Sequence, residues 1–213
     1  MKTYNVKKID PNYLIPNGRA DHFFWDNANV LTQFSSPWHF ENIEDIEFRA
    51  LHDGENLYVC YKVSDASLHI DSTDNSKKSV DNSDRVELFL RSDKMMDPYY
   101  CLEIDPLARV QDFMARPNKE FDFTWDWPSE DISIKSYINE AYFTVELVIS
   151  FESLKRYHLI NKNVIQAGIY RAKYSQQSNG QFTPTWITWV DPKTETPNFH
   201  IASSFGQLLL EGL

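Results

Sequence analysis

The segment 83–105, SDRVELFLRSDKMMDPYYCLEID, constrains the fold more than any other part of the chain. In its first half a purely apolar set of residues alternates with a set that contains the charged ones, and its second half repeats this pattern. A period of two is typical of half-buried β-strands. We therefore predict two strands joined by a connection over 92–98. One face packs in a core, and the other carries an ordered set of charged side chains.

A hairpin through this connection places Glu87 opposite Glu103. If the next segment, RVQDFMAR, forms a third strand, Gln111 falls on the other side of Glu103. Two neighbouring carboxylates are unfavourable unless a cation, a shared proton, a nearby arginine or ligand hydroxyls compensate for the repulsion. Such a conflict with local rules is typical of functional sites, and a different strand register would remove it.

The same register predicts an ion row beside the carboxylate pair. Arg85 falls opposite Asp105 in the hairpin, and Arg109 falls opposite Asp105 from the third strand. Opposed charges across neighbouring strands contribute roughly 0.2–1 kcal/mol for each pair. We therefore expect Arg85, Asp105 and Arg109 to form a stabilising row.

Short alternating runs continue through most of the chain, and they predict about ten or more strands. Helical pattern is minimal, with about one turn in FESLKRYH, and the segment 4–9 is expected to be an edge strand. A length of 213 residues is ordinary for one all-β domain. The prediction is a single all-β domain over 1–213, an antiparallel β-sandwich of the immunoglobulin-like or jelly-roll-like kind.

Composition narrows the classes of partner. The net charge of -10 disfavours nucleic acid and anionic membranes, both of which attract basic surfaces. No apolar run approaches the length of a membrane helix, and the first residues lack the apolar core of a signal peptide. The chain is therefore expected to be cytoplasmic unless a leader has been removed. Cys60 and Cys101 match no metal or redox spacing, and we expect buried thiols or, alternatively, a disulfide.

An acidic stretch over 64–82 is a candidate metal-binding loop. It contains Asp65, Asp71, Asp74 and Asp81, and calcium prefers several oxygen ligands of this kind. Their spacing is not that of an EF-hand loop, so solvated acidic side chains are the other interpretation.

Tryptophans and phenylalanines fall into two groups. Trp25 and Trp189 are expected in the core, while the position of Trp186 stays open. The segment 117–130, PNKEFDFTWDWPSE, contains Trp125 and Trp127 beside two phenylalanines. Soluble proteins rarely expose such a patch unless it binds something, so this segment either binds a ligand or covers one end of the core.

Six motifs, in chain order, resemble those of carbohydrate-binding module family nine, especially its divergent bacterial members. They are DRVELFL, YYCLEID, YFTVELVISFESL, AGIYRAKYS, TWITWVDP and NFHIASSFGQLLL. The resemblance implies a β-sandwich that binds a mono- or oligosaccharide, often as the companion of a glycoside hydrolase in polysaccharide breakdown. It also implies structural calcium.

The resemblance further implies particular sugar-binding residues. The family clamps a terminal sugar between two aromatic rings, and Phe199 matches one of them. Glu87 matches the acid that contacts sugar, whereas 79–82 lacks the second ring and Cys101 stands nearest the expected arginine. Adding the charged face of the hairpin and possible substitute rings gives the candidate sugar-binding set: Phe199, Glu87, Glu103, Gln111, Trp125, Trp127, His200 and Arg85.

Two other functions stay open at this point. Glu87 and Glu103 are a pair of carboxylates of the kind that can hydrolyse glycosidic bonds, although the sequence shows no other catalytic motif. The absent second ring favours instead a structural or protein-interaction domain that has lost sugar binding. Non-catalytic carbohydrate binding is the function that the sequence favours.

Overall fold

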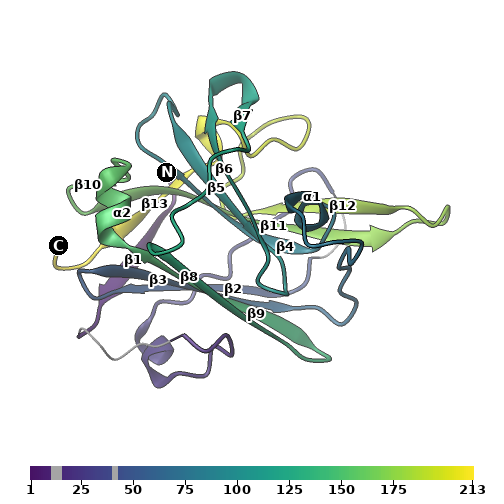
Figure 1. Ribbon diagram of the computed structural model, residues 1–213, viewed down its shortest axis with the longest axis horizontal. Coiled ribbons are helices and arrows are strands. Elements are labelled where there is room, and N and C mark those ends of the chain that lie inside the picture. The colour runs from purple at the N-terminus through teal and green to yellow at the C-terminus, as the bar shows by residue number, and fades with distance from the viewer. Residues whose placement is uncertain (11–15, 40–42) are drawn as a thin grey trace.

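The computed structural model describes residues 1–10, 16–39 and 43–213, and these form an all-β domain with two short helices (Figure 1). The helices are α1 (Lys77–Asp81) and α2 (Phe151–Arg156), and the 3-10 turns are η1 (Phe23–Asn27), η2 (Pro117–Lys119) and η3 (Ala202–Ser204). The strands are β1 (Thr3–Lys8), β2 (Ile46–His52), β3 (Asn56–Ser64), β4 (Arg85–Arg91), β5 (Tyr99–Ile104), β6 (Val110–Arg116), β7 (Glu120–Asp122), β8 (Ile132–Ile138), β9 (Tyr142–Ser150), β10 (Ile160–Asn161), β11 (Val164–Gln176), β12 (Phe182–Thr188) and β13 (Gly206–Leu210). The all-β class and the number of strands agree with the prediction.

The strands form one mixed sheet that curls into a half-barrel. Its order is β7-β6-β5-β4-β11-β13-β1-β2-β3-β9-β8, with β10 and β12 also paired to β11. Two pairings are parallel, between β1 and β13 and between β1 and β2. The expectation of a purely antiparallel arrangement was therefore wrong at β1, because this strand joins elements from opposite ends of the chain.

β1 lies in the middle of the sheet, so its prediction as an edge strand was wrong. Its first residues pair with β13, and its last two, Lys7 and Lys8, pair with β2. The side chains of Tyr4 and Val6 alternate with exposed neighbours and enter the core. A single alternating strand with one buried face looks the same at an edge and at such a junction, so the sequence could not distinguish them.

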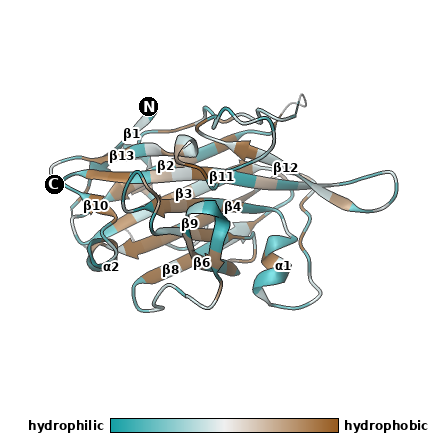
Figure 2. Cartoon of the chain, turned by 90° about the horizontal axis from the view of Figure 1, so that it is seen from above, coloured by the Kyte–Doolittle hydropathy of each residue, from teal (hydrophilic) through white to brown (hydrophobic). Residues whose placement is uncertain are grey.

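The main core lies between the two halves of the curled sheet. It joins apolar residues of β4 and β5, such as Leu88 and Leu102, to residues of β2, β3 and β9, such as Phe48 and Val145. Trp189 belongs to this core, and Trp25 is buried beside β2 and β3, as predicted for both. In Figure 2 the hydrophobic residues concentrate along the strands, whereas α1 is largely hydrophilic.

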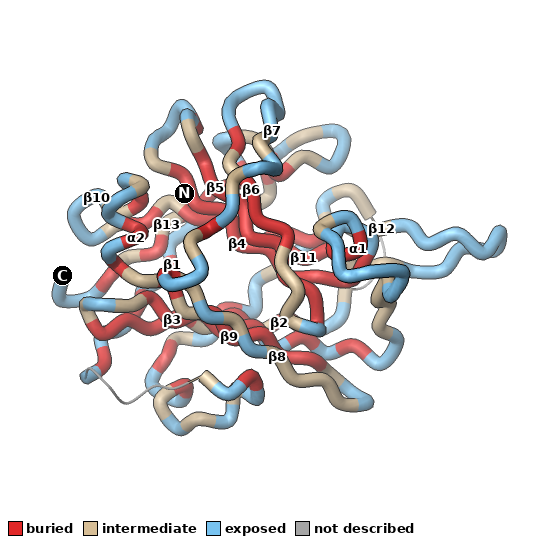
Figure 3. Tube along the Cα trace, in the orientation of Figure 1, coloured by how far each residue is buried: buried red, intermediate tan, exposed pale blue. Residues whose placement is uncertain are grey.

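The opposite face of β4 and β5 is also buried, which corrects the prediction of half-buried strands. Every residue of both strands is buried (Figure 3). The outer face holds a second apolar cluster that includes Phe89, Tyr99 and Tyr170, and the chain after β12 covers it with Phe199 and Phe205. The predicted charged face is therefore enclosed, and its charges must find partners inside the protein.

Two further expectations concern the cysteines and membranes. Cys60 and Cys101 are buried and free, so the interpretation as small hydrophobic residues is confirmed. Within the described part of the chain, no helix has the length and apolar character needed to cross a membrane.

Candidate functional site

A pair of glutamates occupies the centre of the enclosed outer face. Glu87 on β4 lies opposite Glu103 on β5, and Glu103 lies opposite Gln111 on β6. The predicted register is therefore confirmed. The Gln111 Nε2 donates to Glu103 Oε2 over 3.0 Å. Glu87 is only 1% exposed and Glu103 only 5%, so bulk water cannot screen the repulsion between the two carboxylates.

Arg85 compensates the two glutamates. Its Nε lies 3.0 Å from both Glu87 Oε1 and Glu103 Oε2, and its Nη2 lies 3.2 Å from the Asp81 carboxylate. Asp81 ends α1, a helix that begins where the Ser76 side chain caps the Ser79 N–H. A nearby arginine was one of the predicted forms of compensation, and it brings three acids onto one guanidinium.

The predicted ion row is correct at one end only. Arg109 Nε donates to Asp105 Oδ2 over 2.7 Å, as expected. The predicted ion pair between Arg85 and Asp105 was wrong, since the Arg85 guanidinium lies against Glu87 and Glu103 instead. A long arginine side chain can reach either of two neighbouring acids on its face. Asp105 is already paired with Arg109, whereas the two buried glutamates have Arg85 as their cation.

Burial changes the protonation of the pair. It raises the pKa of Glu87 to about 8, with the neighbouring Glu103 charge adding to the rise and Arg85 opposing it. Burial also raises the pKa of Glu103, while Arg85 and the Gln111 hydrogen bond lower it. The glutamate pair therefore retains a proton at pH 7, and Arg85 offsets negative charge beside it.

Aromatic rings from β11, β12 and the following segment form one wall beside this polar floor. The Phe199 ring stacks on Tyr170, with centroids 4.0 Å apart and planes 9° apart. The Trp186 ring lies 5.7 Å from Phe199, nearly perpendicular to it, and 5.4 Å from the Arg85 guanidinium carbon. Ala172 lies opposite both Arg85 and Trp186, and its small side chain leaves space between them.

A second wall comes from β6, β7 and the chain just after β7. The Phe113 ring contacts Phe121 and Phe123 at centroid distances of 5.3 Å and 4.9 Å. Phe121 is 36% exposed and Phe123 is 50% exposed, so these two rings form an accessible rim. His200 lies 4.7 Å from Phe121, and burial lowers its pKa to about 4. The His200 Nδ1 and the Tyr99 hydroxyl form a hydrogen bond of 3.0 Å.

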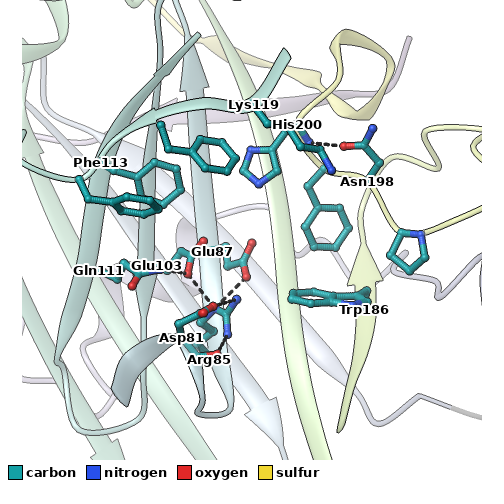
Figure 4. Close-up of a pocket in the computed structure, with 14 residues that line it drawn as sticks. Asp81, Arg85, Glu87, Glu103, Gln111, Phe113, Lys119, Trp186, Asn198 and His200 are labelled. Atoms are coloured by element: carbon teal, nitrogen blue, oxygen red, sulfur yellow. Dashed lines mark hydrogen bonds and ion pairs between the residues drawn. The ribbon is translucent and has the colours of Figure 1, made fainter. Parts of the chain in front are cut away.

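The floor and the two walls enclose a cavity of about 320 Å³, which is within the size range of small-molecule sites. Figure 4 shows Phe113 and Trp186 on opposite sides of the glutamate pair. The lining residues are Asp81, Arg85, Glu87, Glu103, Gln111, Phe113, Lys119, Phe121, Phe123, Trp186, Pro197, Asn198, Phe199 and His200. Six of the eight predicted sugar-binding residues are in this set.

Trp125 and Trp127 lie elsewhere. Both pack against the main core, where Trp125 lies 4.9 Å from Tyr100 and Trp127 is buried near Tyr157. Asp112 fixes this path by accepting a hydrogen bond from the Trp127 backbone N–H over 2.6 Å. The segment thus sends its phenylalanines to the cavity and its tryptophans to the core, so the two tryptophans do not replace the missing ring.

The four candidate calcium ligands do not come together as one site among the described residues. Asp65 pairs with Arg171 and Lys173, and Asp81 pairs with Arg85. Asp71 and Asp74 accept hydrogen bonds within their own loop. Among the described residues no three His, Cys, Asp or Glu side chains are placed to hold a metal ion. The predicted four-aspartate cluster does not fit a calcium ion, because cations of the protein already occupy Asp65.

Several lining residues were missed by sequence reasoning, although two had a usable signal. Phe113 shares the face of Gln111, since the two are two residues apart on β6. Trp186 lies three residues before Trp189, so placing Trp189 in the core directs Trp186 to the other face. The contributions of Phe121, Phe123 and Asn198 depend on loop paths, and nothing in their local pattern predicts them.

Comparisons with known proteins identify a family and several similar folds. The family model described as "Carbohydrate family 9 binding domain-like" matches residues 16–213. A candidate carbohydrate-binding protein from Bacteroides uniformis is 21% identical, with 99% of each chain covered and a TM-score of 0.76. Two structures of a carbohydrate binding module family 9 from Caldicellulosiruptor kristjanssonii, with glucose and with cellotriose, are 19% and 18% identical, each with a TM-score of 0.61. They cover 100% of this chain and 97% and 95% of theirs. The comparison with curated proteins gives no match.

Proposed function

The chain belongs to the carbohydrate family 9 binding domain-like family, and on this premise we propose that its cavity binds a mono- or oligosaccharide without changing it chemically. One observation carries the proposal. Six candidate sugar-binding residues from β4, β5, β6 and the 197–200 segment line a single cavity between two aromatic walls. Residues so distant in sequence converge there without being needed to close the main core.

The chemistry of the cavity suits a neutral sugar. A pyranose presents an apolar C–H face that can lie on a ring such as Trp186, and its hydroxyls can bond to Gln111, Asn198 or the glutamates. The glutamate pair retains a proton at pH 7, so the floor offers both donors and acceptors. Affinity is expected to be modest, because desolvation of the hydroxyls offsets most of the hydrogen-bond gain.

The position of Trp186 bears on the missing ring. This chain has no aromatic residue at 79–82, where the family resemblance expects one. Trp186 lies half-buried beside Phe199 and Arg85, while Phe123 is exposed on the opposite wall. In the proposed complex, a sugar ring lies between these two walls, with Trp186 as the principal stacking surface.

Isothermal titration calorimetry with glucose and cellotriose, the sugars bound in the Caldicellulosiruptor structures, tests the proposal. We expect binding by the parent, loss of about tenfold in affinity in Trp186→Ala, and a similar loss in Glu87→Gln. Trp125→Ala is the matched control, because Trp125 is also half-buried but packs on the core outside the cavity. Absence of binding across a glycan array, or equal losses in Trp186→Ala and Trp125→Ala, would contradict the proposal.

A hydrolytic function has one supporting observation, the raised pKa of Glu87, which a general acid requires. The arrangement argues against it, since Glu87 and Glu103 lie side by side on the floor of the cavity and share Arg85 instead of facing a bond from two sides. Release of reducing sugar from oligosaccharides that is lost in Glu87→Gln would establish the hydrolase. A protein-interaction domain is the outcome if no sugar binds and the exposed Phe121–Phe123 rim captures a protein instead.

Two associated expectations complete the proposal. A sugar-binding domain of this kind would support polysaccharide breakdown by a partner glycoside hydrolase, and co-purification with such an enzyme would test this. Calcium binding stays a prediction, and it requires a ligand set other than the four aspartates together. Native mass spectrometry with and without chelator tests it, since a bound ion adds a mass that chelation removes.

A further inference from the structure

A second cavity lies at the other end of β4. Arg85 at the start of the strand lines the sugar cavity, whereas Arg91 at its end lines a separate cavity of about 480 Å³. The other lining residues come from the chain after β4, from the β10–β11 hairpin and from β13: Ser92, Asp93, Lys94, Leu159, Asn161, Lys162, Val164, Gln166 and Gln207. None of them belongs to the sugar cavity.

Arg91 is a buried cation without an acidic partner. It is only 2% exposed, and no carboxylate among the described residues forms an ion pair with it. Its Nη1 donates to the Ala202 carbonyl and its Nη2 to Gln166 Oε1, each over 3.1 Å, while its Nε has no partner among the residues that the structure describes. A guanidinium has five N–H donors, so most of those on Arg91 are unused. Burial lowers the pKa of Arg91.

The neighbours of Arg91 add N–H donors and positive charge to the cavity, and few negatively charged groups. Lys94 and Lys162 are exposed, and neither forms an ion pair within the described part of the chain. Asn161 and Gln207 carry amide groups for which no side-chain partner is present among the described residues. Asp93 is the single acid in the lining. Three cations and one acid therefore meet in a chain whose net charge is -10.

This arrangement fits an anion. Buried charges in proteins are normally paired, because the cost of removing a charge from water is recovered only through a partner. The planar guanidinium suits an oxyanion, and flanking ammonium groups favour a doubly charged one. We propose that the Arg91 cavity binds a phosphate- or sulfate-type dianion, with Arg91 as the anchor and Lys94 and Lys162 at its mouth.

Thermal unfolding with inorganic phosphate, and with chloride at the same ionic strength, tests this proposal on the whole chain. We expect phosphate to raise the unfolding midpoint above its value in chloride. Calorimetry should show binding roughly tenfold weaker in the Lys94→Ala/Lys162→Ala double variant, which keeps the buried Arg91 and so should fold. Arg91→Lys, which keeps the charge but loses the planar fork, should bind phosphate more weakly than the parent.

The Lys78→Ala/Lys135→Ala double variant is the matched control, because these two lysines are also exposed and lie outside the cavity. It should bind phosphate as the parent does. Glycerol 3-phosphate distinguishes the source of the dianion: tighter binding than phosphate indicates an ester, and equal binding indicates the free ion. No phosphate effect beyond chloride, or equal losses in the two double variants, would overturn the proposal. Sugar binding should be unchanged in all three variants, so the result is independent of the sugar site.

Discussion

Arg85 and Arg91 stand on the same face of one strand, and their surroundings differ sharply. Each is buried, and each guanidinium lies over an aromatic ring, Trp186 for Arg85 at 5.4 Å and Phe205 for Arg91 at 4.8 Å. Arg85 meets three carboxylates, whereas Arg91 meets a backbone carbonyl and an amide oxygen. The same residue type thus supports an excess of negative charge at one end of β4 and an unpaired positive charge at the other.

The difference teaches that the position of a charged residue in an alternating strand does not determine which groups surround its charge. The partners of Arg85 come from α1, β4 and β5, and those of Arg91 come from η3 and β11. One end therefore suits a ligand rich in hydroxyls, because its acids already pair with its arginine and the excess acidic groups can bond to hydroxyls. The other end suits an anion, because its charge is not.

The largest expected effect comes from removing each arginine in turn. Arg85→Met leaves Glu87 and Glu103 buried without a cation, and we expect a loss of roughly 3–5 kcal/mol in the free energy of unfolding at pH 9. Arg91→Met breaks hydrogen bonds to neutral oxygens only, with an expected loss of about 1–2 kcal/mol. Urea unfolding of both variants measures the difference, and equal losses would show that the two ends are alike.

The next effect is the pH dependence of stability at the Arg85 end. The pKa of Glu87 in the folded protein, about 8, is above its ordinary value of 4.5. The folded state therefore holds the proton more tightly, and this stabilisation is full below about pH 4.5 and is lost as the pH rises through 8. From pH 6.5 to 9 the free energy of unfolding should fall by roughly 2 kcal/mol.

Glu87→Gln should remove this slope, because a glutamine does not titrate. The His200 ring, whose pKa is lowered to about 4, stays neutral in the folded protein above pH 6.5. The protons that its unfolded form still binds near pH 6.5 contribute equally to the parent and the variant, so they cancel in the comparison. Urea unfolding of the parent and the variant across this range gives the comparison. Parallel pH profiles would mean that Glu87 is ionised in the folded protein at neutral pH.

A smaller effect separates the two rings beneath the arginines. Phe205 is buried, so Phe205→Leu should lower stability by roughly 1 kcal/mol and leave sugar affinity unchanged. Trp186 is half-buried at the sugar cavity, so Trp186→Leu should change stability less and sugar affinity more. Urea unfolding measures the stability of both variants, and calorimetric titration measures their sugar affinity. A loss of sugar affinity in Phe205→Leu would contradict the prediction.

The smallest effect concerns one acid at each end. The Asp81 side chain is 53% exposed, so Asp81→Asn should lower stability by less than about 0.5 kcal/mol, since Arg85 keeps its two buried partners. Asp93→Asn removes the single acid of the Arg91 cavity, and it should leave stability unchanged while tightening phosphate binding. Weaker phosphate binding in Asp93→Asn would contradict the view that the Arg91 end of β4 favours an anion.

Much of the site could be read from the sequence because strand pairing is local. The β4, β5 and β6 strands follow one another along the chain, so alternation and short connections give their register and place Glu87 beside Glu103. Prediction failed where a side chain had a choice between partners. Arg85 could reach Asp105 or the glutamates, and it pairs with the glutamates while Asp105 is already paired with Arg109.

The segment 117–130 shows the same limit for aromatic residues. Its composition indicates that its rings need burial, yet they lie on opposite sides of the sheet: Phe121 lines the cavity and Trp127 lies in the main core. That division depends on where β7 ends and on the hydrogen bond between Asp112 and the Trp127 backbone. Neither is visible in the local pattern.

The sequence by itself determined the all-β class, the order of the hairpin strands, the glutamate row and the family resemblance. These depend on residue alternation and on contacts between neighbours along the chain. Tertiary structure alone decided that β1 joins the two halves of the sheet, that the charged face is enclosed, and that Trp186 meets Arg85. The physical reason is that these features depend on contacts between segments far apart in the chain, whose positions only the packed core fixes.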